Sequence, residues 1–237
     1  MKWKSLTDSA YAPYSGINNV AALLGESGNW YPGVRVENVS YPLTITADQS
    51  ALFQCLSRKD TPEELYLHEN FVLPEFRKKL WEQEYNLKVA TSEEIQAKEW
   101  YNPYVKINKT EKDTLKELLN YAVTPNSDFQ VSCLLKTTDG KYIPGVNIEV
   151  SDWQTGLCAE RVALSTALAF GVSNFEYLHV HAPKSDFVSP CGACRQVIIE
   201  HMPEKLVYLT HADQTTCSFY TSHLLPFTFS SNQLNRD

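Results

Sequence analysis

The chain of 237 residues lacks a long apolar run and lacks any concentration of basic residues. No stretch approaches the roughly 20 apolar residues that span a bilayer, and the residues after Leu6 are too polar for a secretory signal peptide. We therefore expect a globular, cytoplasmic protein with no membrane contact. Nucleic-acid binding is also disfavoured, because the formal net charge is −7 and Lys and Arg are interspersed with Asp and Glu.

Cysteine is scarce as well, and its six residues are unevenly placed. In a reducing compartment they favour metal or thiol chemistry over a disulfide framework. Three of them, Cys55, Cys133 and Cys217, lie among apolar or small neighbours and are expected to be buried thiols without a further role. The other three fall into two motifs, Cys158-Ala159-Glu160 and Pro190-Cys191-Gly192-Ala193-Cys194.

These two motifs together predict a catalytic zinc site, with one Zn²⁺ per chain. Such sites take three nitrogen or sulfur ligands from the protein and leave the fourth position to water, and Cys158, Cys191 and Cys194 supply three. A ligand, one residue, a Glu and then Pro-Cys-x-x-Cys is the signature of zinc deaminases of nucleobases. Three thiolates carry a strong negative charge, so we expect the guanidinium group of Arg161 or Arg195 to donate a hydrogen bond to a cysteinate sulfur. Arg161 is the first choice.

The chain also resembles itself at one constant offset, which aligns Gly28 with Gly140. The alignment continues without a gap to Leu52, and its identities include Pro32-Gly33-Val34 with Pro144-Gly145-Val146, Glu37 with Glu149, Ala47 with Ala159, and Ala51-Leu52 with Ala163-Leu164. The N-terminal copy lacks the zinc ligands, since Thr46 stands at the place of Cys158 and Asp48 at that of Glu160. The counterpart of the second cysteine motif is Leu73-Pro74-Glu75-Phe76-Arg77, which has no thiol.

Hydrophobic periodicity and turn residues predict alternating helices and strands. Helices are expected at 6–12, 114–123, 158–170 and 191–201, with a Thr-x-x-Asp cap near Thr110, and strands at 19–24, 130–136, 177–182 and 206–210. This alternation predicts an α/β fold in which helices cover a central sheet. We expect a degenerate domain at 1–96, a linker at 97–111 and a catalytic domain at 112–237. His179 and His181 alternate on one strand face, where ordinary packing is a better reading than a second metal site.

The zinc motifs and the repeat resemble the cytidine deaminase family over nearly the whole chain, in two copies. The resemblance implies two α/β/α sandwiches of three layers, each with a mixed central sheet. It implies zinc-dependent hydrolysis of cytidine and 2′-deoxycytidine to the uridines, with release of ammonia, in pyrimidine salvage. It also makes Glu160 the acid and base that carries protons between water, the ring and the leaving ammonia. Ideal helical geometry would not place Glu160 beside Cys158, two residues earlier, so this role rests on the family pattern.

Further roles follow from the same resemblance. Asn147 and Glu149 match the segment that holds the sugar 3′-hydroxyl, Phe129 matches the aromatic residue that lines the base pocket, and Ala159 is expected to contact the substrate. In the family's tetramers a loop similar to the one at Tyr41 reaches a neighbour's substrate, and a C-terminal aromatic similar to Phe227 packs near the active site. We therefore expect a homodimer that imitates the tetramer, with the N-terminal copy retained to complete the site.

Other functions stay open at this point. Deaminases of blasticidin S share these motifs but are usually single domains, and editing of nucleic acids is disfavoured by the acidic charge. A retired nucleoside-binding protein is disfavoured because Cys158, Glu160, Cys191 and Cys194 are all intact. The segments at 130–133 and 151–154 depart from the family pattern, so the preference among ribo-, deoxyribo- and modified cytidines is undetermined.

Overall fold

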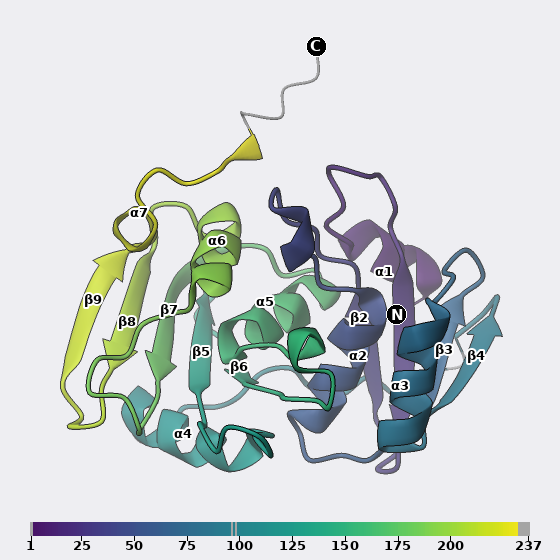
Figure 1. Cartoon of the computed structure of the whole chain (residues 1–237), viewed down its shortest axis with the longest axis horizontal. Coiled ribbons are helices and arrows are strands. Elements are labelled where there is room, and N and C mark those ends of the chain that lie inside the picture. The colour runs from purple at the N-terminus through teal and green to yellow at the C-terminus, as the bar shows by residue number, and fades with distance from the viewer. Residues whose placement is uncertain (1, 96, 98, 232–237) are drawn as a thin grey trace.

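The computed structural model describes residues 2–95, 97 and 99–231 and contains two sheets, each with its own helices (Figure 1). The N-terminal half consists of α1 (Trp3–Ser9), β1 (Val20–Gly25), β2 (Trp30–Val34), η1 (Tyr41–Leu43), α2 (Ala47–Leu56), β3 (Pro62–His68), α3 (Glu75–Tyr85) and β4 (Lys88–Ser92). The C-terminal half consists of α4 (Glu111–Leu118), η2 (Leu119–Tyr121), β5 (Ser132–Thr137), β6 (Tyr142–Val146), η3 (Trp153–Thr155), α5 (Ala159–Ala169), β7 (Phe175–His181), α6 (Gly192–His201), β8 (Leu206–Thr210), β9 (Thr216–Tyr220) and α7 (Thr221–Leu224). None of the helices within these described ranges is long and apolar enough to cross a membrane.

Both sheets are mixed, which confirms the predicted fold class. Their strand orders are β2-β1-β3-β4 and β6-β5-β7-β8-β9. In each sheet one neighbouring pair is parallel, β3 with β4 and β7 with β8, and the other pairs are antiparallel. A parallel pair needs a long crossover, which α3 and α6 provide. Successive β7 side chains point to opposite faces, so His179 meets α4 on one face while Val180 faces the zinc motifs on the other.

The first hairpin of each half has the same register at the offset found in the sequence. Val20 pairs with Val34 in β1 and β2, and their counterparts in the repeat, Ser132 and Val146, pair in the same way in β5 and β6. A Cβ atom at Gly145 would lie 2.1 Å from the carbonyl oxygen of Ala159, and Gly33 has the same relation to Ala47. The repeated Pro-Gly-Val therefore marks a strand on which a helix backbone packs too closely for any side chain.

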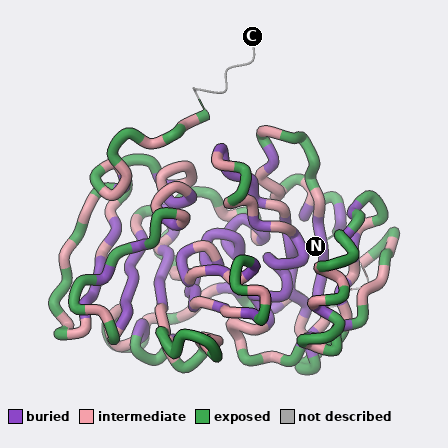
Figure 2. The backbone as a smooth tube through the Cα atoms, viewed as in Figure 1, coloured by how far each residue is buried: buried purple, intermediate pink, exposed green. Residues whose placement is uncertain are grey.

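Helices α2 and α5 pack together in the middle of the molecule, where the backbone is almost entirely buried (Figures 1 and 2). Every residue of α2 except Leu56 is buried. A single cluster of buried side chains joins Leu52 and Phe53 of α2 to Val146 of β6 and to Val162 of α5. The two halves therefore share a hydrophobic core, and each of these side chains contributes about 1.5–3 kcal/mol by its burial.

Two helix predictions are displaced by about one turn for one physical reason. Helix α1 ends at Ser9 rather than at 12, because the backbone N–H of Tyr11 donates to Arg35 and the chain is extended there. Helix α4 begins at Glu111 with the expected cap, in which Thr110 accepts from the N–H of Asp113 at 3.1 Å. It ends early because Val123 pairs with Ile148. Strands β3, β4 and β9 and helix α3 were not predicted.

Candidate zinc centre and active site

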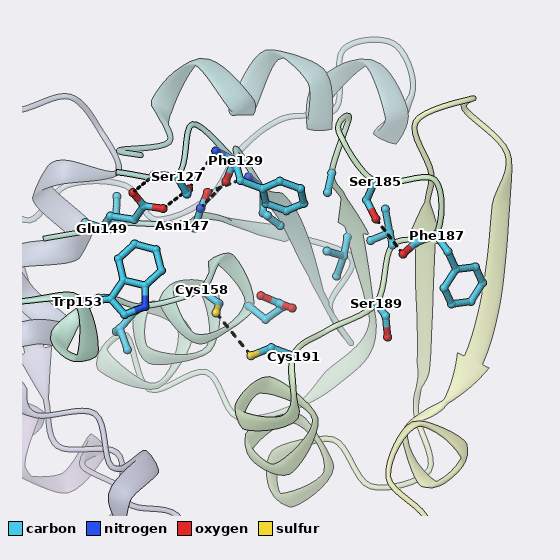
Figure 3. Close-up of a pocket in the computed structure, with 18 residues that line it drawn as sticks. Ser127, Phe129, Asn147, Glu149, Trp153, Cys158, Ser185, Phe187, Ser189 and Cys191 are labelled. Atoms are coloured by element: carbon cyan, nitrogen blue, oxygen red, sulfur yellow. Dashed lines mark hydrogen bonds between the residues drawn. The ribbon is translucent and has the colours of Figure 1, made fainter. Parts of the chain in front are cut away.

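Three cysteines meet where the N-termini of α5 and α6 converge. Cys158 is the N-cap of α5, Cys191 is the N-cap of α6, and Cys194 lies in the first turn of α6. Their sulfur atoms all lie within 4.8 Å of one another, and the Sγ atoms of Cys158 and Cys191 are 3.7 Å apart (Figure 3). Two thiolates on one tetrahedral zinc, with Zn–S near 2.3 Å, would be about 3.8 Å apart. The spacing and the soft donor set both fit zinc.

The surroundings favour an anionic sulfur in this cluster. Contact with the Cys158 thiol lowers the pKa of Cys191, and the N–H of Cys194 donates to the Cys191 sulfur at 3.5 Å. The same contact raises the pKa of Cys158. Two helix N-termini also point their partial positive charge at the sulfurs. Contact with Cys158 and Cys191 also raises the pKa of Cys194, so the lowered pKa in the cluster is that of Cys191. Zinc binds thiolates, and Cys191 is the sulfur whose surroundings favour that form.

Glu160 lies beside this cluster, although it follows Cys158 by only two residues. Cys158 has an extended backbone, with φ −67° and ψ 158°, so the spacing on an ideal helix does not apply to the pair. The Glu160 side chain is 3% exposed and borders the same cavity as Cys158 and Cys191. Burial raises its pKa to about 7. A carboxyl group with such a pKa can both accept and donate a proton near neutral pH.

The cavity above the cluster has a volume of about 520 Å³ and aromatic rings at its edge. Phe129, Trp153 and Phe187 line it and are exposed, and Figure 3 shows Phe129 and Trp153 near the labelled Cys158 while the Phe187 ring lies farther from the sulfurs. Cys158, Glu160 and Cys191 also line it, so the zinc motifs open into this space. Flat rings at the opening and a polar, soft-ligand floor suit a planar heterocycle that carries a polar group.

The two predicted sugar-binding side chains line the cavity and also hold its wall. The Asn147 amide donates to the carbonyl of Phe129 at 2.8 Å and accepts from the N–H of Val131 at 2.8 Å. The Glu149 carboxylate accepts from the N–H of Ser127 at 3.1 Å and from the Ser127 hydroxyl. The N–H of Phe129 donates to the Ser127 hydroxyl at 3.0 Å, so Asn147 holds Phe129 directly and Glu149 holds it through Ser127 (Figure 3).

Ala159 lies elsewhere than on the cavity wall. It is fully buried in the first turn of α5, and its carbonyl faces Gly145. It is not among the residues that line the cavity.

The two arginines have partners other than the expected cysteinate. Arg161 donates from one terminal nitrogen to the carbonyl of Leu43 at 3.0 Å, across the junction between the halves, while its buried Nε has no partner among the described residues. Arg195 donates to Pro190 at 2.8 Å, to the hydroxyl of Ser189 at 2.6 Å, and to a more distant carbonyl. The planar guanidinium of Arg195 bonds the oxygens of the residues just before Cys191. Arg195 therefore stabilises the turn that carries Cys191 and does not bond the cysteine sulfur.

Tyr41 and Phe227 do not line the cavity of their own chain. Both are exposed, Tyr41 in η1 and Phe227 at a left-handed turn with φ 60°. The aromatic residues at the opening are instead Trp153 and Phe187. Sequence reasoning noted Trp153 only as a departure from the family pattern, and it missed Phe187, whose one signal was its place just before Pro190.

The corresponding place in the N-terminal half is occupied by an ion pair. Thr46 is the N-cap of α2, as Cys158 is of α5, and Arg77 lies three residues after the N-cap of α3, as Cys194 does in α6. Arg77 lies 3.5 Å from the carboxylate of Asp48, which also accepts from the indole N–H of Trp81 at 2.8 Å. Asp48 is fully buried. A guanidinium cation therefore sits where the other half gathers three metal ligands.

Comparison with known proteins agrees with these features. The family model described as the cytidine and deoxycytidylate deaminase zinc-binding region matches residues 108–210. The chain is 36% identical over 123 residues to a probable cytidine deaminase of Dictyostelium discoideum, an alignment that covers 52% of this chain and 83% of that protein. It is 40% identical over 121 residues to a cytidine deaminase of Sporosarcina psychrophila, covering 51% of this chain and 89% of that protein.

Two further matches are shorter or weaker. A blasticidin-S deaminase of Bacillus cereus is 32% identical over 87 residues, which cover 33% of this chain and 62% of that protein. Among solved structures, a cytidine deaminase from Burkholderia pseudomallei matches with a TM-score of 0.48 and 35% identity, covering 51% of this chain and 100% of that one.

Proposed function

Because the chain belongs to the cytidine deaminase family, we propose that it hydrolyses cytidine and 2′-deoxycytidine to the corresponding uridines and ammonia. The observation that carries the proposal is the floor of the cavity. Three cysteine sulfurs with the spacing of zinc ligands lie there beside the buried carboxyl group of Glu160. This combination would hold a metal ion with its water and would provide a proton carrier in one place.

Cys158, Cys191 and Cys194 would hold the zinc ion. When bound, zinc acts as a Lewis acid that brings the pKa of a water molecule towards neutrality. Glu160 would take one proton from the attacking water as the C–O bond forms at C4 of the pyrimidine, and would pass that proton to N3. It would then take the proton of the new C4 hydroxyl and deliver it to the amino group as the C–N bond breaks and C4 becomes a carbonyl. The two protons of the water thus end on N3 and on ammonia, and no oxidant or reductant is needed.

The cavity wall would orient the nucleoside for this reaction. Phe129 would contact the base, and Asn147 and Glu149 would bind the sugar hydroxyl, since each borders the cavity. A carboxylate oxygen can accept more than one hydrogen bond, so Glu149 can hold Ser127 and a ligand together.

The remaining parts of the proposal concern the whole chain. The repeat supports a tandem arrangement of a degenerate domain at 1–96, a linker at 97–111 and a catalytic domain at 112–237, with one zinc in the last. The ion pair of Asp48 and Arg77 supports an N-terminal half that needs no metal. The exposure of Tyr41 and Phe227 supports a homodimer in which they meet a second chain. A cytoplasmic role in pyrimidine salvage completes the proposal.

The test is the loss of ultraviolet absorbance when the purified protein is mixed with cytidine. A Glu160→Gln variant of nearly the same size should keep its zinc and deaminate at least about a hundred-fold more slowly. Zinc is measured on both proteins by elemental analysis. If the wild type holds zinc and leaves cytidine and deoxycytidine unchanged, the proposed function is wrong.

A modified cytosine nucleoside such as blasticidin S is the second candidate. The likeness to the Bacillus cereus enzyme and the exposed rings of Trp153 and Phe187 at the opening favour it. The same assay with blasticidin S separates the two, because the true substrate will have the higher kcat/KM.

A further inference from the structure

A chain of hydrogen bonds leads from the ion pair of the N-terminal half to the turn before the first zinc ligand. Arg77 donates to the hydroxyl of Thr46 at 2.6 Å, and that hydroxyl donates to the side-chain oxygen of Gln49 at 2.7 Å. The N–H of Thr46 donates to the same oxygen at 3.1 Å. The amide nitrogen of Gln49 then donates to the carbonyl of Thr155 at 2.9 Å, in a fully buried contact between the halves.

This network fixes the orientation of the Gln49 amide. Its oxygen receives two hydrogen bonds from Thr46, so the nitrogen must be the group that faces Thr155. Arg77, a pure donor, occupies an acceptor side of the Thr46 hydroxyl, which favours the orientation in which the hydroxyl hydrogen points to Gln49. The Arg77 contact therefore supports the contact between Thr46 and Gln49.

Thr155 is well placed to influence the zinc site. It ends η3, is 5% exposed, and is followed by Gly156 and Leu157, which line the cavity, and then by the ligand Cys158. Leu157 is tied on its other side, where its N–H donates to Ile148 at 3.0 Å. The Gln49 contact and this strand pairing hold the segment from both ends.

The junction repeats the contact in the opposite direction. Arg161, which aligns with Gln49 in the repeat, donates to the carbonyl of Leu43, which aligns with Thr155. Such reciprocal contacts are the mark of a two-fold interface, here between two halves of one chain. Arg161 thus contacts the zinc-free half, and Gln49 contacts the half with the three cysteines. Gln49 is the one whose amide is oriented by a neighbouring cation.

We propose that Arg77, Thr46 and Gln49 are positioning residues for the zinc centre of the other half. The Arg77 cation occupies the place in the N-terminal half that corresponds to the three-cysteine cluster, and through Thr46 it aligns the amide that holds Thr155. On this proposal, the ion pair of Arg77 with Asp48 helps to fix the segment that precedes Cys158. The inference rests on the proposed function only in that zinc binds the three cysteines.

Gln49→Glu is the sharpest test, because it keeps the size and the acceptor for Thr46 but replaces the donor to Thr155 with a carboxylate oxygen. Zinc release from the purified, zinc-loaded protein to a coloured chelator should be about ten-fold faster than in the wild type. The matched control is Gln54→Glu on the same helix. Gln54 is also buried and also donates from its amide, but to Pro32 and Ser50 within its own half. Q54E should lower the melting temperature and leave zinc release at the wild-type rate.

A second set of variants tests Arg77. Replacing it alone would leave Asp48 buried and unpaired, so the double variant Asp48→Asn/Arg77→Met removes both charges. It should release zinc as fast as Gln49→Glu, and adding Q49E to it should cause no further increase, since the two act through one contact. Equal release rates in Q49E, Q54E and wild type, or additive effects, would overturn the proposal. A wild type that binds no zinc would instead contradict the proposed function.

Discussion

Three residue positions distinguish the two halves at the point where their helices begin. Cys158, Glu160 and Cys194 gather around a metal position, whereas Thr46, Asp48 and Arg77 bond to one another. Three thiolates around a divalent cation leave a net negative charge, while a carboxylate with a guanidinium is neutral. The partial positive charge of the helix N-termini offsets the negative charge of the thiolates, whereas the neutral ion pair needs no such compensation. The N-terminal half is therefore a completed ion-pair site rather than an empty metal site.

Glu111 gives a pH-dependent contribution to stability on the far face of the second sheet. Burial alone would raise its pKa, but hydrogen bonds from His179, Tyr177 and Tyr142 outweigh burial and lower the pKa to about 2. His179 lies 2.8 Å from one carboxylate oxygen, and Tyr142 donates to the other at 2.9 Å. A carboxyl group with a lowered folded-state pKa stabilises the fold above its unfolded pKa, and this contribution is lost as pH falls.

We predict that the wild type loses more stability than Glu111→Gln between pH 5 and pH 3. The ordinary pKa of 4.5 and the folded value near 2 define the window, so the contribution is complete above about pH 5 and declines below it. The measurement is urea unfolding of both proteins at several pH values. Zinc release in acid affects both equally, so parallel curves for the two would contradict the role given to Glu111.

At the scale of elements, the loop before α6 is held by the β8–β9 hairpin. The Phe187 ring stacks on His211 with centroids 5.1 Å apart, and the N–H of Val188 donates to His211 Nδ1 at 3.0 Å. The N–H of Ala212 donates to Ser185 at 3.0 Å. Since Ser185, Phe187 and Val188 line the cavity, the hairpin sets one wall of the substrate site.

His211 should therefore affect KM more than zinc content. His211→Phe keeps a ring for Phe187 but leaves the buried N–H of Val188 unpaired, at a cost of about 1–3 kcal/mol. His211→Asn keeps an acceptor and loses the ring stack, which is worth about 0.5–1.5 kcal/mol. We expect KM for cytidine to rise about ten-fold in H211F and less in H211N, with full zinc in both. Equal KM values in the two variants would show that the N–H contact is unimportant.

The sequence allowed prediction of those elements that depend on local pattern. The cluster of three cysteines was predicted from residue type and spacing, and strand β8 was predicted with its observed bounds. The repeat was visible because Gly33 and Gly145 are both required by close packing on a helix. The ends of α1 and α4 were misplaced because they depend on pairing with Val36 and Ile148, far along the chain.

The cavity wall and the role of the arginines depended on contacts that no local pattern reveals. Phe187 is positioned by His211, which lies beyond both α6 and β8 in the chain. Arg161 was expected at a cysteine sulfur, but its described hydrogen bond goes to Leu43 in the other half. Gln49 carried no signal at all, because its importance depends on how the two halves pack.

At the scale of the whole molecule, the outer helix of each half is bonded to a loop of the other. Glu200 of α6 accepts from the N–H of Val39 at 2.9 Å and from the hydroxyl of Tyr11 at 3.0 Å. Glu84 of α3 accepts at 3.1 Å from the N–H of Ser151, which is the counterpart of Val39 in the repeat. Together with the shared core between α2 and α5, these contacts make the halves mutually dependent for stability.

We therefore predict that removing zinc destabilises both halves in one transition, although the three clustered cysteines belong to the second. Trp153→Phe removes the tryptophan that borders the cavity, so the fluorescence of the variant follows Trp81, buried behind Asp48, and the other tryptophans before α4. Labelling of Cys133, which is fully buried in β5 and lies outside the three-cysteine cluster, follows the second half. Chelation should lower the melting temperature seen by both probes by at least about 5 °C, and the two transitions should coincide. An unchanged melting temperature of the tryptophan signal after zinc removal would contradict this prediction. It would show that the N-terminal half, with its own ion pair, is stable without support from the shared core.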